Sequence, residues 1–204
     1  DSLFCIDCLA GMPLTGFEAC TENPVEKNLR RRIAIHSASA HLYFTKNSAV
    51  RQSLHRFKYE GRKEIGRYLG RRMGYALRDS GRFQDCQIII PLPLHAAREK
   101  ARGYNQAAVL AESISEILQI PVAGQSLVRI SGTATQTRRN RIQRWQNMAN
   151  KFRVAHPEQI TGKHILLVDD IITTGATLEA CAQNLLGTEG VSLSIATLAY
   201  TVSG

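Results

Sequence analysis

Two adjacent carboxylates, Asp169 and Asp170, are the residues of this chain best placed for chemistry. They come directly after residues 164–168, whose apolar run predicts a buried strand. The residues that follow supply hydroxyls and a flexible backbone at the start of a predicted helix: Thr173, Thr174, Gly175, Ala176 and Thr177. Carboxylates accept hydrogen bonds from a sugar diol, and a helix N-terminus stabilises a phosphate. The segment therefore predicts a sugar clamp beside a phosphate cradle.

An ordinary strand-to-helix turn, with threonine caps and exposed acids, is the alternative interpretation of this segment. It accounts for the threonines and for Gly175, but it does not explain why two carboxylates stand next to each other after the strand. The usual nucleotide-binding signatures are absent: the chain has no GxGxxG, and Gly162-Lys163 lacks the preceding glycine of a P-loop. We therefore favour the sugar and phosphate site.

The elements that must position this site alternate between strands and helices, after an irregular first stretch. Apolar patterning predicts strands at residues 33–44, 87–90, 151–154, 164–168 and 192–200. It predicts helices from residue 48, between Gly61 and Gly81, and over residues 105–118 and 177–186. This order is typical of an α/β protein with a mostly parallel sheet that helices cover on both sides.

Charge is unevenly distributed along the 204 residues, whose net charge is +9. Residues 51–153 carry 20 basic and 7 acidic side chains, whereas residues 154–204 carry one basic and five acidic ones. A basic middle indicates a polyanionic partner. The longest apolar run is far shorter than the roughly 18 residues of a membrane span, and no apolar leader opens the chain. We therefore expect a cytoplasmic protein without membrane insertion.

The segment from Val168 to Leu178 closely resembles the phosphoribosyl pyrophosphate (PRPP) motif of type I phosphoribosyltransferases. In that family the acidic pair holds the ribose hydroxyls and the following loop binds the 5′-phosphate. The resemblance thus assigns the ribose to Asp169 and Asp170, and the 5′-phosphate to residues 173–177. Further blocks are similar to the competence protein F (ComF) branch of this fold: residues 55–61, 90–94, 102–106, 136–137 and 144–147.

The resemblance implies PRPP with Mg²⁺ as the ligand and a type I phosphoribosyltransferase-like domain over residues 46–204. It places Pro93, Leu94 and Arg102 on the pyrophosphate side. It makes residues 136–147 a mobile lid, in which Arg144 would act with the two aspartates in catalysis. For any single arginine of this lid, a solvated surface is the alternative. Arg139 and Gln143 depart from the family, which has an apolar residue and an acid there.

The cysteines at the front, Cys5 and Cys8, have the spacing of a zinc knuckle, but one pair cannot close a four-ligand site. The stretch 8–13 is similar to the second cysteine pair of the N-terminal zinc ribbon of ComF proteins. The resemblance therefore implies that residues 1–45 are a truncated zinc-ribbon-like segment and linker, with Zn²⁺ in the full-length protein. Two unremarkable thiols are the alternative. Cys86 and Cys181 lie among apolar neighbours and are expected to be reduced thiols.

Two hypotheses of function follow. The first is a phosphoribosyltransferase that transfers the pentosyl group to a nitrogen nucleophile, for which the sequence offers no clear recognition residue. The second is a non-catalytic PRPP sensor that binds single-stranded DNA. ComF proteins are associated with natural transformation and DNA uptake, which implies a partner in that machinery. Aromatic residues in the basic region could stack on bases, although helical spacing is more typical of core residues: Phe57, Tyr59, Tyr68 and Tyr75. The oligomeric state stays open.

Overall fold

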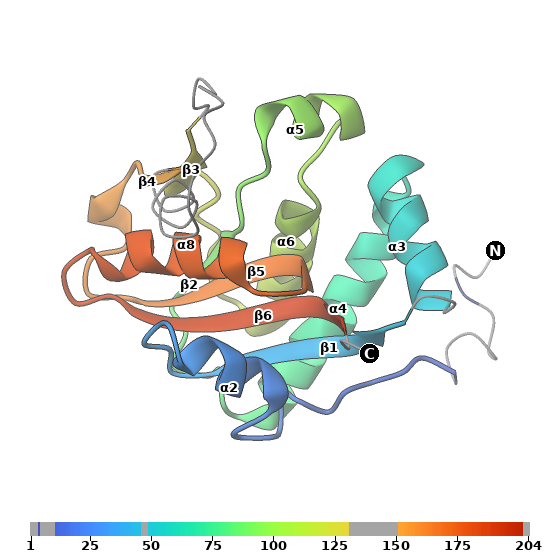
Figure 1. Ribbon diagram of the computed structural model, residues 1–204, viewed down its shortest axis with the longest axis horizontal. Helices are drawn as coiled ribbons and strands as arrows, with labels where there is room; N and C mark the ends of the chain where they lie inside the picture. Colours follow the sequence, from blue (N-terminus) through green and yellow to red (C-terminus); the bar gives the residue numbers. More distant parts are fainter. Residues whose placement is uncertain (1–3, 5–10, 46–48, 131–150, 202–204) are drawn as a thin grey trace, which may run out of the picture.

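Four parallel strands form the central sheet of this chain, in the order β1-β6-β5-β2 (Figure 1). The computed structural model describes residues 4, 11–45, 49–130 and 151–201. The strands of the sheet are β1 (Ala38–Phe44), β2 (Ile88–Pro91), β5 (His164–Ile172) and β6 (Ser192–Thr201). A separate antiparallel pair consists of β3 (Leu127–Arg129) and β4 (Phe152–Val154). The predicted α/β class with a mostly parallel sheet is confirmed.

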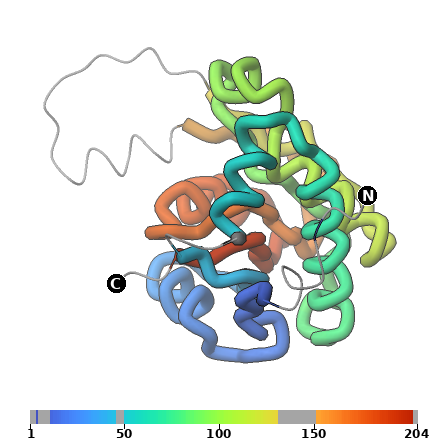
Figure 2. The backbone as a smooth tube through the Cα atoms, turned by 90° about the vertical axis from the view of Figure 1, so that its right-hand side faces the viewer, coloured from blue at the N-terminus to red at the C-terminus, as the bar shows by residue number. Residues whose placement is uncertain are grey.

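Helices cover both faces of this sheet. The helices of the described ranges are α2 (Pro24–Arg30), α3 (Ala49–Tyr59), α4 (Lys63–Ser80), α5 (Ala96–Arg102), α6 (Gln106–Leu118) and α8 (Ala176–Leu186), with a 3₁₀ turn, η1 (Pro157–Gln159). Figures 1 and 2 show α2 and α8 on one face, and α4 and α6 on the other. Helix α3 stands on the side of the molecule toward which the strands run, near their carboxyl ends (Figure 1). The helices thus leave the carboxyl ends of the strands to form a site.

The side chains of β5 alternate between two apolar clusters, because successive residues of a strand face opposite ways. Ile165 and Leu167 pack with the helices α2 and α8, whereas Leu166 and Val168 pack with α3, α4 and α6. All four side chains are fully buried. Burial on both faces explains why the strand reads as a continuous apolar run rather than an alternating one.

Helix α3 is held on α4 by the aromatic ring of Phe57, which lies against a glycine. A Cβ atom at Gly66 would come within 2.2 Å of that ring, so only glycine allows this approach. Phe57 is fully buried, and its carbonyl accepts a hydrogen bond from the hydroxyl of Tyr104, between α5 and α6. The C-terminal end of α3 is therefore fixed by contacts with two other parts of the fold.

The predicted helices and strands are present, with changes at their ends. The helix expected between Gly61 and Gly81 is α4, and Gly81 ends it in the left-handed conformation, with φ of 69°. The strand predicted to end at residue 168 continues to Ile172, because β5 keeps pairing with β6 as far as Tyr200. The isolated extended segment predicted at residues 33–44 is a strand only from Ala38.

The prediction that the first stretch is irregular is wrong for part of it. Helix α2 begins after Asn23, whose side chain accepts hydrogen bonds from the backbone N–H groups of Val25 and Glu26. From residue 38 the chain joins the central sheet, where β1 pairs with β6. The described part of residues 1–45 thus shares a core with the later domain. Whether the residues before it resemble a zinc ribbon stays a prediction.

Candidate functional site

The two carboxylates of the predicted site lie within the last part of β5. Because the strand continues to Ile172, Asp169 and Asp170 are not beyond its end, as the sequence suggested, but inside it. Strand alternation directs their side chains to opposite faces, although the backbone N–H of Asp170 donates to Oδ1 of Asp169 over 2.8 Å. Both residues are half-buried. Two neighbouring acids therefore have different surroundings.

Asp169 is the more perturbed of the two acids. Burial raises the pKa of its carboxyl to about 8, and the negative charge of Asp170 adds to this rise. The hydrogen bond from the Asp170 backbone and the charge of Lys58 oppose it. A carboxyl with such a pKa holds its proton at neutral pH, so that Asp169 can donate a hydrogen bond there as well as accept one.

Asp170 has a cationic partner that sequence reasoning did not assign to the site. The ammonium of Lys58, at the end of α3, lies 2.7 Å from Asp170 Oδ2. The exposed fractions of the two side chains are only 17% and 15%, so water screens this ion pair poorly. Lys58 belongs to the block 55–61 that resembles ComF proteins, but nothing in its position along the chain indicated this contact.

The predicted phosphate cradle lies between β5 and α8. Thr173, Thr174 and Ala176 are exposed, and Thr177 is half-buried in the first turn of the helix. The N-cap residue of α8, Gly175, has no side chain, and the Thr174 hydroxyl accepts only a long hydrogen bond, 3.4 Å, from the backbone N–H of Ala176. Since the first N–H groups of a helix lack partners within it, this turn offers donors to an anion, with threonine hydroxyls beside them.

The shape of the cradle depends on Gly175, which adopts a left-handed backbone conformation with φ of 77°. An added Cβ would lie 3.1 Å from Arg32 Nη2 and 3.1 Å from a methyl group of Leu29. Arg32 supports the loop from this side: Nη2 donates to the carbonyl of Thr174 at 2.8 Å, and Nη1 pairs with Glu179 at 2.7 Å. Arg32 is a second residue that the sequence analysis missed.

The segment assigned to the pyrophosphate follows the neighbouring strand, β2. The backbone N–H of Leu92 donates to the carbonyl of Val168 at 2.8 Å, next to Asp169. Pro93 and Leu94 come after it and are half-buried. Parallel pairing of β2 with β5 thus brings these two parts of the predicted site together.

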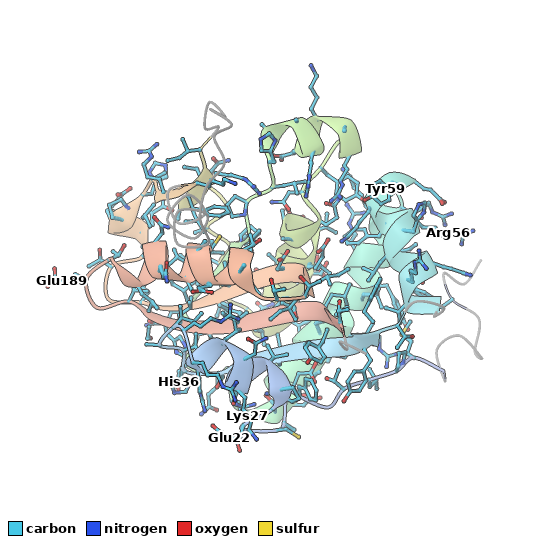
Figure 3. The ribbon with its side chains drawn as sticks, viewed as in Figure 1. Glu22, Lys27, His36, Arg56, Tyr59 and Glu189 are labelled. Carbon is cyan, nitrogen blue, oxygen red and sulfur yellow. The ribbon has the colours of Figure 1, made fainter. Side chains whose placement is uncertain are left out.

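Arg102 lies one helix further along, at the end of α5, a helix that the sequence analysis did not predict. Its guanidinium donates to Gln106 Oε1 at 2.7 Å and to the hydroxyl of Tyr59 at 3.3 Å. Figure 3 shows Tyr59 at the end of α3, beside α5. Arg102 therefore joins α5 to the helix that carries Lys58.

The remaining predicted residues fall outside the described part of the chain. These are Arg144, with the lid candidate 136–147, and the cysteines Cys5 and Cys8. Among the described residues, Cys20, Cys86 and Cys181 are free thiols, and no cluster of three or more metal-ligating side chains occurs. Burial raises the pKa of the Cys86 thiol to about 12, which favours an unreactive structural role.

Comparison with known proteins agrees with this geometry. Residues 105–204 match the family described as the phosphoribosyl transferase domain. Competence protein F of Haemophilus influenzae is 36% identical over 146 residues, which make up 69% of this chain and 64% of that protein. The DNA utilization protein YhgH of Escherichia coli O157:H7 is 32% identical over 152 residues, 73% of this chain and 66% of that protein. This chain thus spans about two thirds of the length of these relatives.

Among solved structures, one to which the chain is similar is the glutamine PRPP amidotransferase of B. subtilis, complexed with ADP and GMP. It is 16% identical, covers 69% of this chain and 30% of its own, and superposes with a TM-score of 0.46. The matched domain and the parallel sheet define a protein of the type I phosphoribosyltransferase fold. Within it, the chain belongs to the ComF family. No helix in the described ranges has the length and apolar character of a membrane span.

Proposed function

We propose that this protein binds PRPP with Mg²⁺ and acts in DNA uptake, either by transferring the phosphoribosyl group or by sensing it, in the cytoplasm. The observation that carries this proposal is the continuity of the site. The acidic pair at the end of β5, the start of α8 and the segment after β2 are adjacent along the edge of one sheet. They match, in order, a ribose, its 5′-phosphate and the pyrophosphate on its anomeric carbon.

The roles of the individual residues follow from this arrangement. Asp169 and Asp170 would bind the ribose hydroxyls, while residues 173–177 would bind the 5′-phosphate. Pro93, Leu94 and Arg102 would lie on the pyrophosphate side, and Arg144 would reach the leaving group from the lid. In the enzyme hypothesis, these groups orient the sugar and stabilise the departing pyrophosphate while a nitrogen nucleophile attacks the anomeric carbon.

Magnesium fits the oxygen chemistry of this site. Among the described residues, no side chain or backbone group donates to Asp170 Oδ1, so this oxygen is available as a ligand, whereas Asp169 would have to release its proton to serve as one. Mg²⁺ prefers such oxygens together with substrate phosphates, and when bound it would neutralise the negative charge of the pyrophosphate. For zinc, the proposal rests only on the sequence pattern at Cys5 and Cys8, in a longer protein.

Calorimetric titration of the chain with PRPP and Mg²⁺ is expected to give saturable, one-site binding that a chelator abolishes. The same protein should then be incubated with PRPP and a panel of nucleobases, nucleosides and ammonia, and pyrophosphate release should be measured. Release with one acceptor would establish transfer. Binding without release for every acceptor would support the sensor hypothesis. Absence of PRPP binding would overturn both.

Single-stranded DNA is a second candidate ligand, and two exposed aromatic side chains favour it. Tyr59 and Tyr75 are 63% and 42% exposed, so the expectation that these aromatics belong to the core is wrong for them, whereas Phe57 is a core residue. The guanidinium groups of Arg102 and Arg78 lie 5.1 and 5.0 Å from the centroids of these two rings. Rings with adjacent cations suit stacked bases and phosphates.

Binding of a fluorescent oligonucleotide is expected to weaken steeply as salt concentration rises, with a log–log slope of about −0.7 for each neutralised phosphate. The variant Y59L/Y75L should lose affinity with little change in this slope, because it keeps every cation. A slope near zero for the wild-type protein would rule out an electrostatic DNA interface.

A further inference from the structure

Because of the ion pair between Lys58 and Asp170, each carboxyl group of the acidic pair has one oxygen in contact with a partner and, among the described residues, one oxygen without one. Asp169 Oδ1 accepts a hydrogen bond from the backbone N–H of Asp170, and Asp170 Oδ2 forms an ion pair with the ammonium of Lys58. Within the described chain, each side chain keeps one carboxyl oxygen without a donor. A vicinal diol has two neighbouring hydroxyls, and one oxygen from each side chain can serve each of them.

We propose that Lys58 is a positioning residue of the sugar site, which fixes the carboxylate of Asp170 so that its second oxygen receives a hydroxyl of the ligand. This inference rests on the proposed function, because it needs the acidic pair to bind a ribose. It assigns to α3, a helix outside the PRPP motif, an indirect part, through Asp170, in recognising the diol of a phosphorylated pentose.

The position of Lys58 is itself fixed, as positioning requires. The preceding residue, Phe57, is fully buried against α4, and its carbonyl accepts from Tyr104. The following residue, Tyr59, accepts from Arg102. The backbone around Lys58 is thus tied to both α4 and the α5–α6 connection, so the ammonium reaches Asp170 from a rigid support.

The same contacts link the two ends of the site. Asn105, which caps α6, donates to the carbonyl of Leu92 on the pyrophosphate side, and Tyr104 beside it contacts the end of α3. A low exposed fraction makes the Lys58–Asp170 pair resistant to exchange with water. Lys58 therefore acts on the ligand through Asp170. This role does not require Lys58 to contact the pyrophosphate itself.

The test compares Lys58→Met with the wild-type protein by calorimetry on three probes: PRPP with Mg²⁺, ribose 5-phosphate, and inorganic pyrophosphate with Mg²⁺. Loss of a charge-assisted contact is expected to weaken PRPP and ribose 5-phosphate by the same factor, about tenfold or more. Pyrophosphate has no diol, and its affinity should change by less than about twofold after correction for the lost charge. A loss for pyrophosphate as large as that for PRPP would overturn the proposal.

Matched variants separate positioning from general effects. Arg56→Met removes the same charge from an exposed position on α3, where Arg56 pairs with Glu60, and it should leave all three affinities near wild type. Lys58→Arg keeps the cation and should restore most of the ribose 5-phosphate affinity. In an Asp170→Asn background, Lys58→Met should cost nothing further, whereas a full additional loss would mean that Lys58 acts independently of Asp170.

The outcomes also distinguish this proposal from the proposed function. If the wild-type protein binds PRPP and Asp170→Asn weakens it, but Lys58→Met does not, only the positioning role fails. If Lys58→Met binds ribose 5-phosphate more tightly, Lys58 competes with the sugar, and the proposal fails in the opposite sense. If the wild-type protein binds no probe, both proposals fail. Circular dichroism melts of every variant verify that each is folded.

Discussion

Replacing Asp169 and Asp170 together by asparagine is expected to weaken PRPP binding about 100-fold, because the ligand loses a hydrogen bond to the charged carboxylate of Asp170, at about 1.5–3 kcal/mol, and one to the neutral carboxyl of Asp169, at about 0.5–1.5 kcal/mol. Asparagine keeps the size of the side chain, so the sheet should stay intact. The amide nitrogen also places a donor where the site needs an acceptor for a hydroxyl or for Mg²⁺. Calorimetry with PRPP and Mg²⁺ measures the loss, and thermal melts verify the fold.

The control is D79N/D85N, which removes two negative charges at exposed positions away from the carboxyl ends of the strands, at least as many as D169N/D170N removes at neutral pH, where Asp169 is protonated. Its PRPP affinity should stay within about twofold of wild type, since exposed charges at this distance are largely screened. An equal loss of PRPP affinity in both double variants would mean that the loss comes from the change in net charge and not from the site. Unchanged binding in D169N/D170N would remove the ribose role from these residues.

The motif itself could be predicted from sequence because all of its parts are local. A buried strand, two carboxylates, threonines and Gly175 occur within a short stretch, and each residue type has a known preference there. In the structure Gly175 has a left-handed conformation and α8 begins directly after it. What the pattern did not reveal is that β5 continues through the aspartates, so that each carboxyl has its own environment.

Lys58 and Arg32 could not be predicted, because their contacts depend on how distant elements pack. Lys58 reaches Asp170 only since α3 rests on α4 through Phe57, and Arg32 reaches Thr174 only since α2 covers the same face as α8. The chain has 26 lysines and arginines, so residue type alone does not indicate which two of them contact the site.

Short helices were missed for a different reason. Both α2 and α5 span seven residues, too few for a 3.6-residue period to emerge. Their caps were nevertheless visible in the sequence: Asn23 precedes Pro24 at the start of α2, and Gly103 follows the end of α5. Capping residues were therefore a better signal for these helices than hydrophobic periodicity.

The single variant Asp169→Asn is expected to stabilise the metal-free, ligand-free protein at alkaline pH while it weakens PRPP binding. In the folded protein burial raises the pKa of Asp169 from 3.8 to about 8, so between these values the folded state holds a proton that the unfolded chain releases. The free energy of unfolding of the wild type therefore falls as pH rises through this window and levels off above it. Asparagine is neutral at every pH and removes this decline.

Chemical denaturation at pH 5 and pH 9, in the presence of a chelator, measures the difference. At pH 5 the unfolded chain already releases the Asp169 proton that the folded state keeps, so the variant should show only a small part of its full advantage in stability. At pH 9 this advantage should be larger than at pH 5 by at least about 2 kcal/mol, since each pKa unit corresponds to about 1.4 kcal/mol. Parallel pH profiles for both proteins would contradict the raised pKa. A gain in stability with a loss of binding would identify Asp169 as a residue kept for the ligand at the expense of the fold.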